Sequence, residues 1–193
     1  MPTMSDPFFF GYGSLVNRAT HAFDDAHPAQ LCGWRRAWRH TNLRQRAFLT
    51  AVPASEDSII DGLVAHVPGD DWAALDEREH GYERTRVTEL IRHSVGRPVH
   101  VQVYAIPEGK YGVPDVCHPV LLSYINVVVQ GYLREFGEAG VARFFDTTDG
   151  WEAPILDDRA APIYARHQVL SADEHALVAD HLARVGARLI ERA

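Results

Sequence analysis

The sequence has few cysteines and no long apolar run, and each absence excludes a class of protein. Only two cysteines, Cys32 and Cys117, occur among its 193 residues. They lack the Cys-x-x-Cys spacing of a zinc site and are too few for a disulfide framework, so we expect reduced thiols. No segment reaches the roughly 18 uninterrupted apolar residues that a membrane span requires. No basic region precedes the first apolar run, so we expect a cytoplasmic protein without a membrane partner.

Positive charge is also scarce. The chain has 19 Lys and Arg against 26 Asp and Glu, a net charge of -7. This balance argues against nucleic acid as a partner and favours a small neutral or zwitterionic substrate. Residues 34–46 do interleave tryptophans with arginines, as in a nucleic-acid stacking platform. A strand with one aromatic face and one arginine face explains the pattern more simply, and RNA binding stays an alternative.

Several catalytic motifs are missing as well. The dinucleotide fingerprint Gly-x-Gly-x-x-Gly fails because Val16 stands at its third glycine, and the Gly-x-Ser-x-Gly elbow fails because Leu15 and Val16 follow Ser14. The 11 histidines form neither His-Glu-x-x-His nor His-x-His. We therefore expect no metal site, and a serine hydrolase is disfavoured.

The patterns that are present predict an α+β fold in a single domain, residues 1–193. Continuous or alternating apolar residues predict strands within 7–12, 31–44, 47–54, 58–69, 82–93 and 97–106, the last two being neighbours in one sheet. Helical spacing predicts helices over about 70–79, 118–137 and 171–191, the last opening with a capping box of Ser171 and Glu174. Residues 147–170 are expected to form an irregular connection.

The first candidate for chemistry is the segment Gly11, Tyr12, Gly13, Ser14 and Leu15, which follows the first strand. Its two glycines let the chain turn sharply and leave backbone N–H groups uncovered, so that they can point at a ligand oxygen. Ser14 adds a hydroxyl to the same rim. The alternative is a simple turn that ends the strand, because Gly-x-Gly alone is a weak motif.

The second candidate is Glu79, at the end of the short helix expected over 70–79. At about 100° per residue it lies about 20° from Trp72, with Leu75 on the same face. Glu77 and Arg78 fall outside that face and are expected in solvent. Partial burial and the negative end of the helix dipole both raise the pKa of a carboxyl group, which suits proton exchange near neutral pH. The alternative is that Glu79 caps the helix or pairs with an arginine.

Taken together, these segments resemble the γ-glutamylcyclotransferase family, with its AIG2-like and ChaC-like relatives. The resemblance rests on FGYGSL as the substrate loop, LDEREHGY as the Leu-Asp-x-x-Glu segment, and the later segments VQVYAI and LLSYINVVVQG. They occur in the family's order between residues 8 and 131. The resemblance implies a small closed β-barrel flanked by helices, without a cofactor.

The resemblance also implies the reaction and the roles of the residues. In the family, the α-amine of a γ-glutamyl group attacks its own γ-carbonyl and releases 5-oxoproline and an amino acid or amine. Glu79 would be the general acid and base, and the loop 11–15 would hold the γ-glutamyl group. Tyr82, Tyr104 and Tyr124 match tyrosines that line the family's pocket.

Two departures from the family's pattern bear on the substrate. The loop lacks the asparagine that some members carry directly after the serine, and REHGY is shorter than the REKGGY of the glutathione-directed ChaC branch. The ChaC activity is therefore the less expected one. A non-catalytic module that binds γ-glutamyl metabolites is the alternative, and the pattern leaves a homodimer open.

Overall fold

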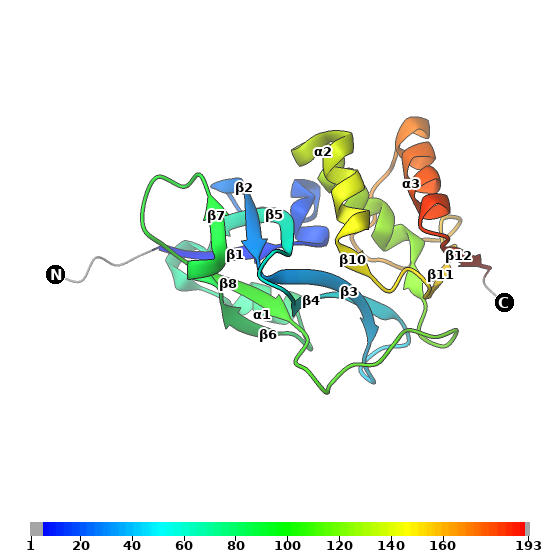
Figure 1. Cartoon of the computed structure of the whole chain (residues 1–193), viewed down its shortest axis with the longest axis horizontal. Coiled ribbons are helices and arrows are strands. Elements are labelled where there is room, and N and C mark those ends of the chain that lie inside the picture. Colours follow the sequence, from blue (N-terminus) through cyan, green and yellow to red (C-terminus); the bar gives the residue numbers. More distant parts are fainter. Residues whose placement is uncertain (1–5, 192–193) are drawn as a thin grey trace.

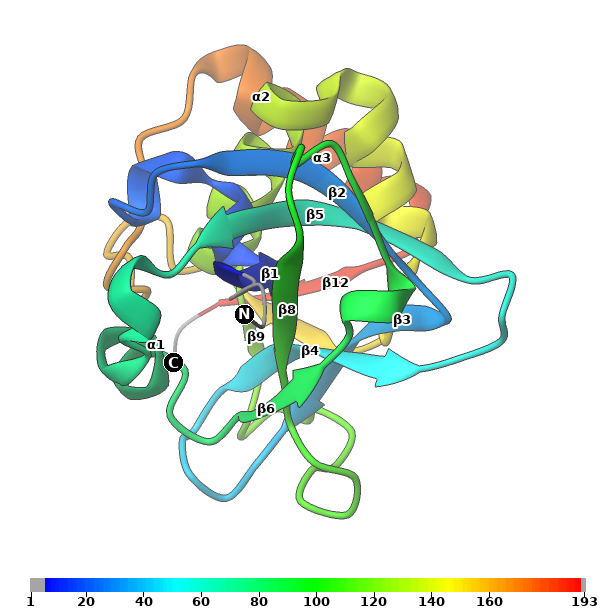
Figure 2. The same cartoon turned by 90° about the vertical axis from the view of Figure 1, so that its left-hand side faces the viewer.

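Six strands between Asp6 and Ala105 form one curled sheet. The computed structural model describes residues 6–191, and these strands pair in the order β6-β8-β1-β5-β2-β7. Phe8, Phe9 and Phe10 of the inner strand β1 are at most 1% exposed, which confirms a buried strand there. Figure 2 shows β2 and β5 running across β8 as the sheet curls. The bounds are β1 Asp6–Gly11, β2 Ala26–Cys32, β5 Ile59–His66, β6 Glu83–Arg86, β7 Ile91–His93 and β8 Val99–Ala105.

Two smaller sheets complete the β structure. The hairpin of β3 (Trp34–His40) and β4 (Ala47–Pro53) is extended by β10 (Thr148–Asp149), and β9 (Val120–Leu121), β11 (Pro154–Leu156) and β12 (Arg188–Ile190) form the third sheet. Within residues 6–191 no pairing joins the outer strands β6 and β7, so the expected closed barrel is not seen. The reason is that β3 and β4 pair with each other instead of closing the larger sheet.

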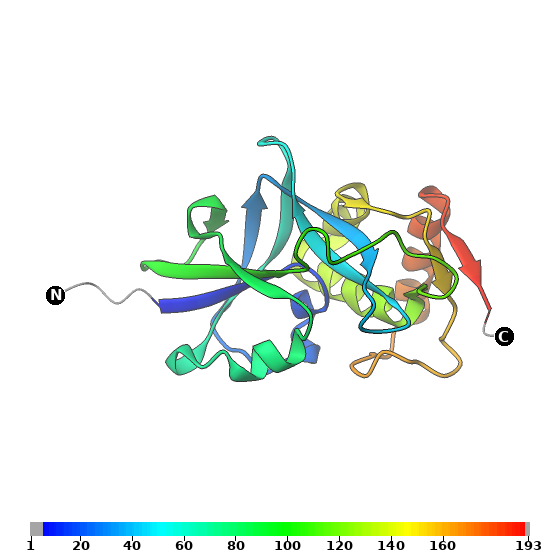
Figure 3. The same cartoon turned by 90° about the horizontal axis from the view of Figure 1, so that it is seen from below.

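Three α-helices accompany the sheets: α1 (Ala73–Arg78), α2 (Leu122–Asp146) and α3 (Ala172–Arg184). In Figure 1, α2 and α3 pack side by side at the end of the protein opposite the start of β1, and Figure 3 shows the β3–β4 hairpin (blue to cyan) extending from the curled sheet toward these helices. Helix α2 also contacts β5 of the curled sheet. The capping box is confirmed, because Ser171 and Glu174 each accept a hydrogen bond from the other's backbone N–H. No helix in the described part of the chain is long and apolar enough to cross a membrane.

The expected helix over 171–191 is too long. It ends at Arg184, since Gly186 takes a φ of 68°, which breaks the helical path. The chain then forms β12 beside β11, and Leu189 is 47% exposed instead of lying on an apolar stripe. The connection 147–170 is likewise more ordered than expected, because it contains β10 and β11.

One arginine of β3 departs from the expected division into an aromatic and an arginine face. Trp34, Arg36 and Trp38 alternate onto the same buried face, and Arg36 has no exposed surface. Its guanidinium lies 5.2 Å from the centre of the Tyr132 ring and 4.9 Å from that of Phe144, both from α2. These rings and its hydrogen bonds compensate the burial of the charge. Arg36 therefore belongs to the core and not to a nucleic-acid surface.

Candidate active site

The loop after β1 is built by close backbone approach. A Cβ atom on Gly62 of β5 would lie 2.4 Å from the Gly11 carbonyl oxygen, so only glycine fits beside this turn. Tyr12 then enters the core, where its hydroxyl donates to the Tyr104 carbonyl oxygen at 2.6 Å. Residues Ser14–Val16 form a short 3₁₀ turn, in which Val16 N–H donates to the Gly13 carbonyl. The turn holds the Gly11–Leu15 segment in one conformation.

Helix α2 braces this loop from behind. The Asn17 side chain, 1% exposed, donates to the Val127 carbonyl and to the Gln130 side chain at 3.0 Å each. The Tyr132 hydroxyl lies 2.9 Å from the Tyr12 carbonyl oxygen. A buried polar side chain with all its partners in place specifies a unique arrangement. The loop is therefore a rigid part of the protein.

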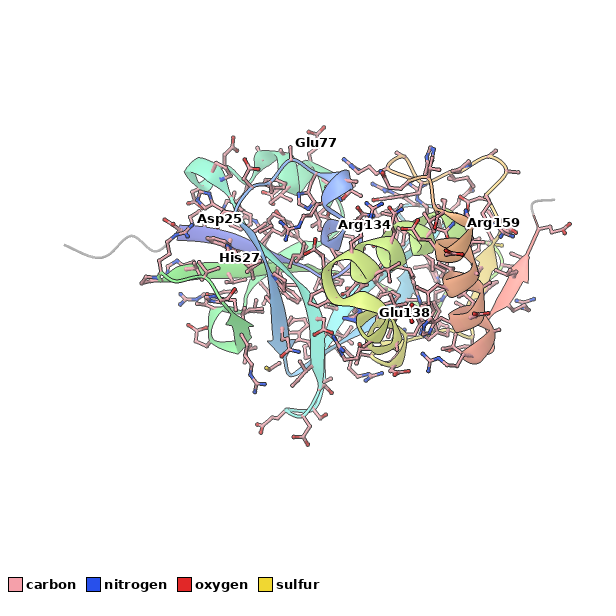
Figure 4. All side chains as sticks on the ribbon, turned by 90° about the horizontal axis from the view of Figure 1, so that it is seen from above. Asp25, His27, Glu77, Arg134, Glu138 and Arg159 are labelled. Atoms are coloured by element: carbon pink, nitrogen blue, oxygen red, sulfur yellow. The ribbon has the colours of Figure 1, made fainter. Side chains whose placement is uncertain are left out.

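Arg78 also fixes the loop, contrary to the expectation that it lies in solvent. Its side chain is only 8% exposed. It donates to the Thr20 carbonyl oxygen at 2.9 Å and to the Ser14 hydroxyl at 3.2 Å. The expectation was wrong because α1 is a short helix that lies against the loop. Side chains on more than one face of its last turn therefore have neighbours, and Arg78 is one of them. Glu77 does point away from the body of the protein, as expected (Figure 4).

Glu79 caps the end of α1, and its backbone N–H donates to the Leu75 carbonyl at 2.8 Å. Its side chain is 18% exposed and lies 3.3 Å from the Arg78 guanidinium. Burial raises the pKa of the Glu79 carboxyl, and the positive charges of Arg78, Arg166 and Arg44 oppose that rise. Both sequence interpretations thus describe the residue: it ends the helix and contacts an arginine, and it is also a carboxyl with a raised pKa.

The three expected tyrosines surround the same space but use their hydroxyls differently. Tyr82 donates to the Leu49 carbonyl at 2.7 Å. Tyr104 donates to the carboxylate of Asp76, an exposed residue of α1, at 2.5 Å. Tyr124 points at the loop: a Cβ atom on Gly13 would lie 2.5 Å from its hydroxyl oxygen. Burial raises the pKa of all three hydroxyls well above the ordinary value, so they stay protonated and neutral.

All nine residues expected at the site line one cleft. Its inner part is bounded by the whole loop Gly11–Leu15 together with Glu79, Tyr82, Tyr104 and Tyr124. An outer part continues from it, and Glu79 lies on the wall of both. The structure thus brings together segments far apart in the sequence around a single carboxyl group.

The outer part contains residues that the sequence analysis did not assign to the site. They include Arg44, Arg46, Tyr164 and Arg166. Arg44 and Arg46 follow β3 in the connection to β4, whereas Tyr164 and Arg166 come from the connection before α3. No local motif marks these residues, because only the folded chain places the two connections on the same cleft.

A second group of side chains has the residue types of a metal centre. His40, Asp115 and His118 place one side-chain ligand atom each within 4.8 Å of one another. The two imidazole rings stack with their centres 4.2 Å apart and an angle of 17° between their planes. Since the lone pairs of an imidazole lie in its ring plane, stacked rings direct them side by side and not toward a shared ion. Asp115 already accepts from His118 and from two backbone N–H groups. The cluster does not fit a metal ion.

Comparison with models of protein families shows which family the chain belongs to. The family model for gamma-glutamyl cyclotransferase, AIG2-like, matches residues 9–123. The chain belongs to this family. The match includes the loop, Glu79, Tyr82 and Tyr104 and ends directly before Tyr124. Arg166 lies beyond it. The family resemblance found in the sequence is thereby confirmed, whereas comparison with curated protein sequences gives no match.

Solved structures of the family's fold resemble the chain at low sequence identity. One described as a gamma-glutamyl cyclotransferase has a TM-score of 0.55 and 14% identity, with 90% of this chain and 98% of that one covered. The uncharacterized protein loc79017 from Homo sapiens gives 0.55 and 14%, covering 89% and 97%. YkqA from Bacillus subtilis gives 0.55 and 16%, covering 75% of this chain and 56% of that one. These values establish a shared mixed α+β fold.

Proposed function

We propose that the protein is a γ-glutamylcyclotransferase in which Glu79 is the general acid and base. The observation that carries the proposal is a partly buried carboxyl group facing a glycine-rich loop in a cleft lined by tyrosines. Membership of the gamma-glutamyl cyclotransferase, AIG2-like family supports it. The products are 5-oxoproline and a released amino acid or amine, and the reaction needs no cofactor.

The proposed reaction is an intramolecular aminolysis. The α-nitrogen of the γ-glutamyl group attacks its γ-carbonyl carbon, a C–N bond forms, and the original amide C–N bond breaks. Glu79 takes a proton from the attacking amine and returns it to the leaving nitrogen. The raised pKa of Glu79 suits both steps, because a group that accepts and donates within one cycle works best near the operating pH.

The loop is proposed to bind the γ-glutamyl group and to stabilise the oxyanion that develops on its carbonyl. Within residues 6–191 the Gly13 N–H has no hydrogen-bond acceptor, so it is free to donate to a ligand. The bracing of the loop by α2 and Arg78 supports this role, since preorganised donors stabilise a transition state without further ordering. A cytoplasmic location and a homodimer remain predictions from the sequence.

The test is a panel of γ-glutamyl amino acids, γ-glutamyl amines and glutathione, assayed for 5-oxoproline. The proposal expects release of 5-oxoproline from at least one compound, together with an equal amount of the amine product. If γ-glutamyl compounds bind in calorimetry but none is converted, the protein is a binding module with the same cleft. If none binds, the cleft has a different ligand.

A further inference from the structure

The cleft has two parts that meet at Glu79. The inner part is bounded by the Gly11–Leu15 loop, and the outer part by Arg44, Arg46 and Arg166. In the proposed reaction the carboxyl group must lie beside the bond that breaks. When the γ-glutamyl group occupies the inner part, the leaving group therefore extends into the outer part.

Arg78 also lines the outer part and forms a salt bridge with Glu79, unlike the three other arginines there. None of these three forms a salt bridge with any carboxylate in residues 6–191. Arg44 instead lies over the Phe48 ring, with 5.5 Å from its guanidinium carbon to the ring centre. Arg46 is half-buried, and burial together with the nearby charge of Arg44 lowers its pKa.

Such a cluster has an energetic cost that a ligand can offset. Like charges at short range repel, and the partial burial of Arg46 weakens its hydration. The whole protein carries a net charge of -7, so acidic side chains to pair with them are plentiful in the sequence. Among residues 6–191, Glu79 is the one carboxylate on the wall of this part of the cleft, which carries several arginines, so we expect further counter-charge to come with the substrate. Guanidinium groups bind carboxylates through paired, charge-assisted hydrogen bonds.

We propose, building on the function proposed above, that Arg44, Arg46 and Arg166 bind a carboxylate of the leaving group. The substrates are then γ-glutamyl amino acids or peptides, whose leaving nitrogen belongs to an amino acid. γ-Glutamyl amines, which lack that carboxylate, are poor ligands. Arg44 and Arg46 lie within the segment that matches the family model, whereas Arg166 comes from the connection beyond it.

The arrangement also links binding to proton transfer. Arg44 and Arg166 each lower the pKa of Glu79. A carboxylate bound between them neutralises part of their charge and so raises the proton affinity of Glu79 when substrate is present. This change favours removal of the proton from the attacking amine.

The test compares two ligands that differ only in the carboxylate: γ-glutamyl-alanine and γ-glutamyl-ethylamide. Binding is measured by calorimetry on the full chain carrying Glu79→Gln, so that turnover does not interfere. We expect the dipeptide to bind about 10- to 100-fold more tightly, the loss typical of one charge-assisted hydrogen bond. Adding Arg44→Gln and Arg166→Gln is expected to reduce this ratio toward one. Both arginines are exposed, so the variants are expected to fold.

Arg134→Gln is the matched control, because Arg134 is an exposed arginine of α2 that does not line the cleft (Figure 4). Like each of the two cleft substitutions, it removes one positive charge, and it is expected to leave the ratio unchanged. Equal affinity for the two ligands overturns the inference. So does an equal loss of both ligands in the arginine variants, because the arginines then hold the γ-glutamyl part. Failure of the proposed function is a separate result: native protein that releases no 5-oxoproline from either compound.

Discussion

Gly13→Ala tests whether the loop and Tyr124 are fitted to each other. The added Cβ atom would lie 2.5 Å from the Tyr124 hydroxyl oxygen and 3.4 Å from a methyl carbon of Leu49. To reach ordinary contact, the hydroxyl must retreat by about 1 Å. The ring is held edge-on by Trp38 and Tyr164, with centres 5.9 and 5.0 Å away, so it does not move freely. Overpacking of this kind costs about 1–3 kcal/mol of stability.

The same displacement affects the cleft. A shift of about 1 Å in a substrate-positioning group lowers the rate by about 100-fold, so kcat/KM for 5-oxoproline release is expected to fall by that factor. Thermal unfolding measures the expected loss of stability. The control is Gly96→Ala, because a Cβ atom there has no neighbour within 4 Å.

A double variant isolates the contact itself. In Gly13→Ala with Tyr124→Phe the opposing oxygen is gone, and the next ring atom lies 3.7 Å from the new Cβ, an ordinary distance. Stability is expected to recover relative to Gly13→Ala alone. Two results would refute this account of the loop. One is a Gly13→Ala variant with the Tm and the kcat/KM of the native protein, and the other is a double variant that is no more stable than Gly13→Ala alone.

Further predictions concern pH and packing. Because burial raises the pKa of Glu79 and the base must be unprotonated, kcat/KM falls with decreasing pH at a higher pH than an exposed glutamate would give. Arg78 lowers that pKa, so Arg78→Gln shifts the acidic limb further upward; a downward shift contradicts this assignment. The same variant loses the bonds to Thr20 and is expected to lower the Tm. Gly62→Ala places a Cβ atom 2.4 Å from the Gly11 oxygen, and urea unfolding should show a loss of about 1–3 kcal/mol.

The sequence predicted several strands of the curled sheet because they have strong local signals, and it grouped the loop with Glu79 through the family's motifs. The strand expected over 82–93 is in fact two strands, of which β6 pairs with β8 and β7 with β2. Continuous or alternating apolar residues marked β1, β5 and β8, and the family's motifs occur in order. Strand β2 was not predicted because Pro28 and its polar neighbours interrupt the apolar alternation typical of a strand. It nevertheless pairs with β5 over seven residues. Tertiary pairing with β5 and β7, and not the local sequence, makes this segment a strand.

The remaining errors have the same origin. The last helix was extended too far because spacing alone shows Leu189 in step with the helix, whereas the turn at Gly186 and pairing with β11 decide the structure. Arg78 and Arg166 were not assigned to the site, because their positions depend on how separate connections meet. Motifs therefore located the residues of the inner part of the cleft, and only the fold reveals those of its outer part.

The central claim is that Glu79 transfers the proton in a cyclisation, and one comparison tests it most directly. 5-Oxoproline release from γ-glutamyl-alanine is measured for the native chain, for Glu79→Gln and for Glu77→Gln, which changes an exposed glutamate two residues away on α1. The account predicts release by the native chain and by Glu77→Gln, and loss of release in Glu79→Gln with an unchanged circular dichroism spectrum. Release by a folded Glu79→Gln protein at the native rate would contradict it.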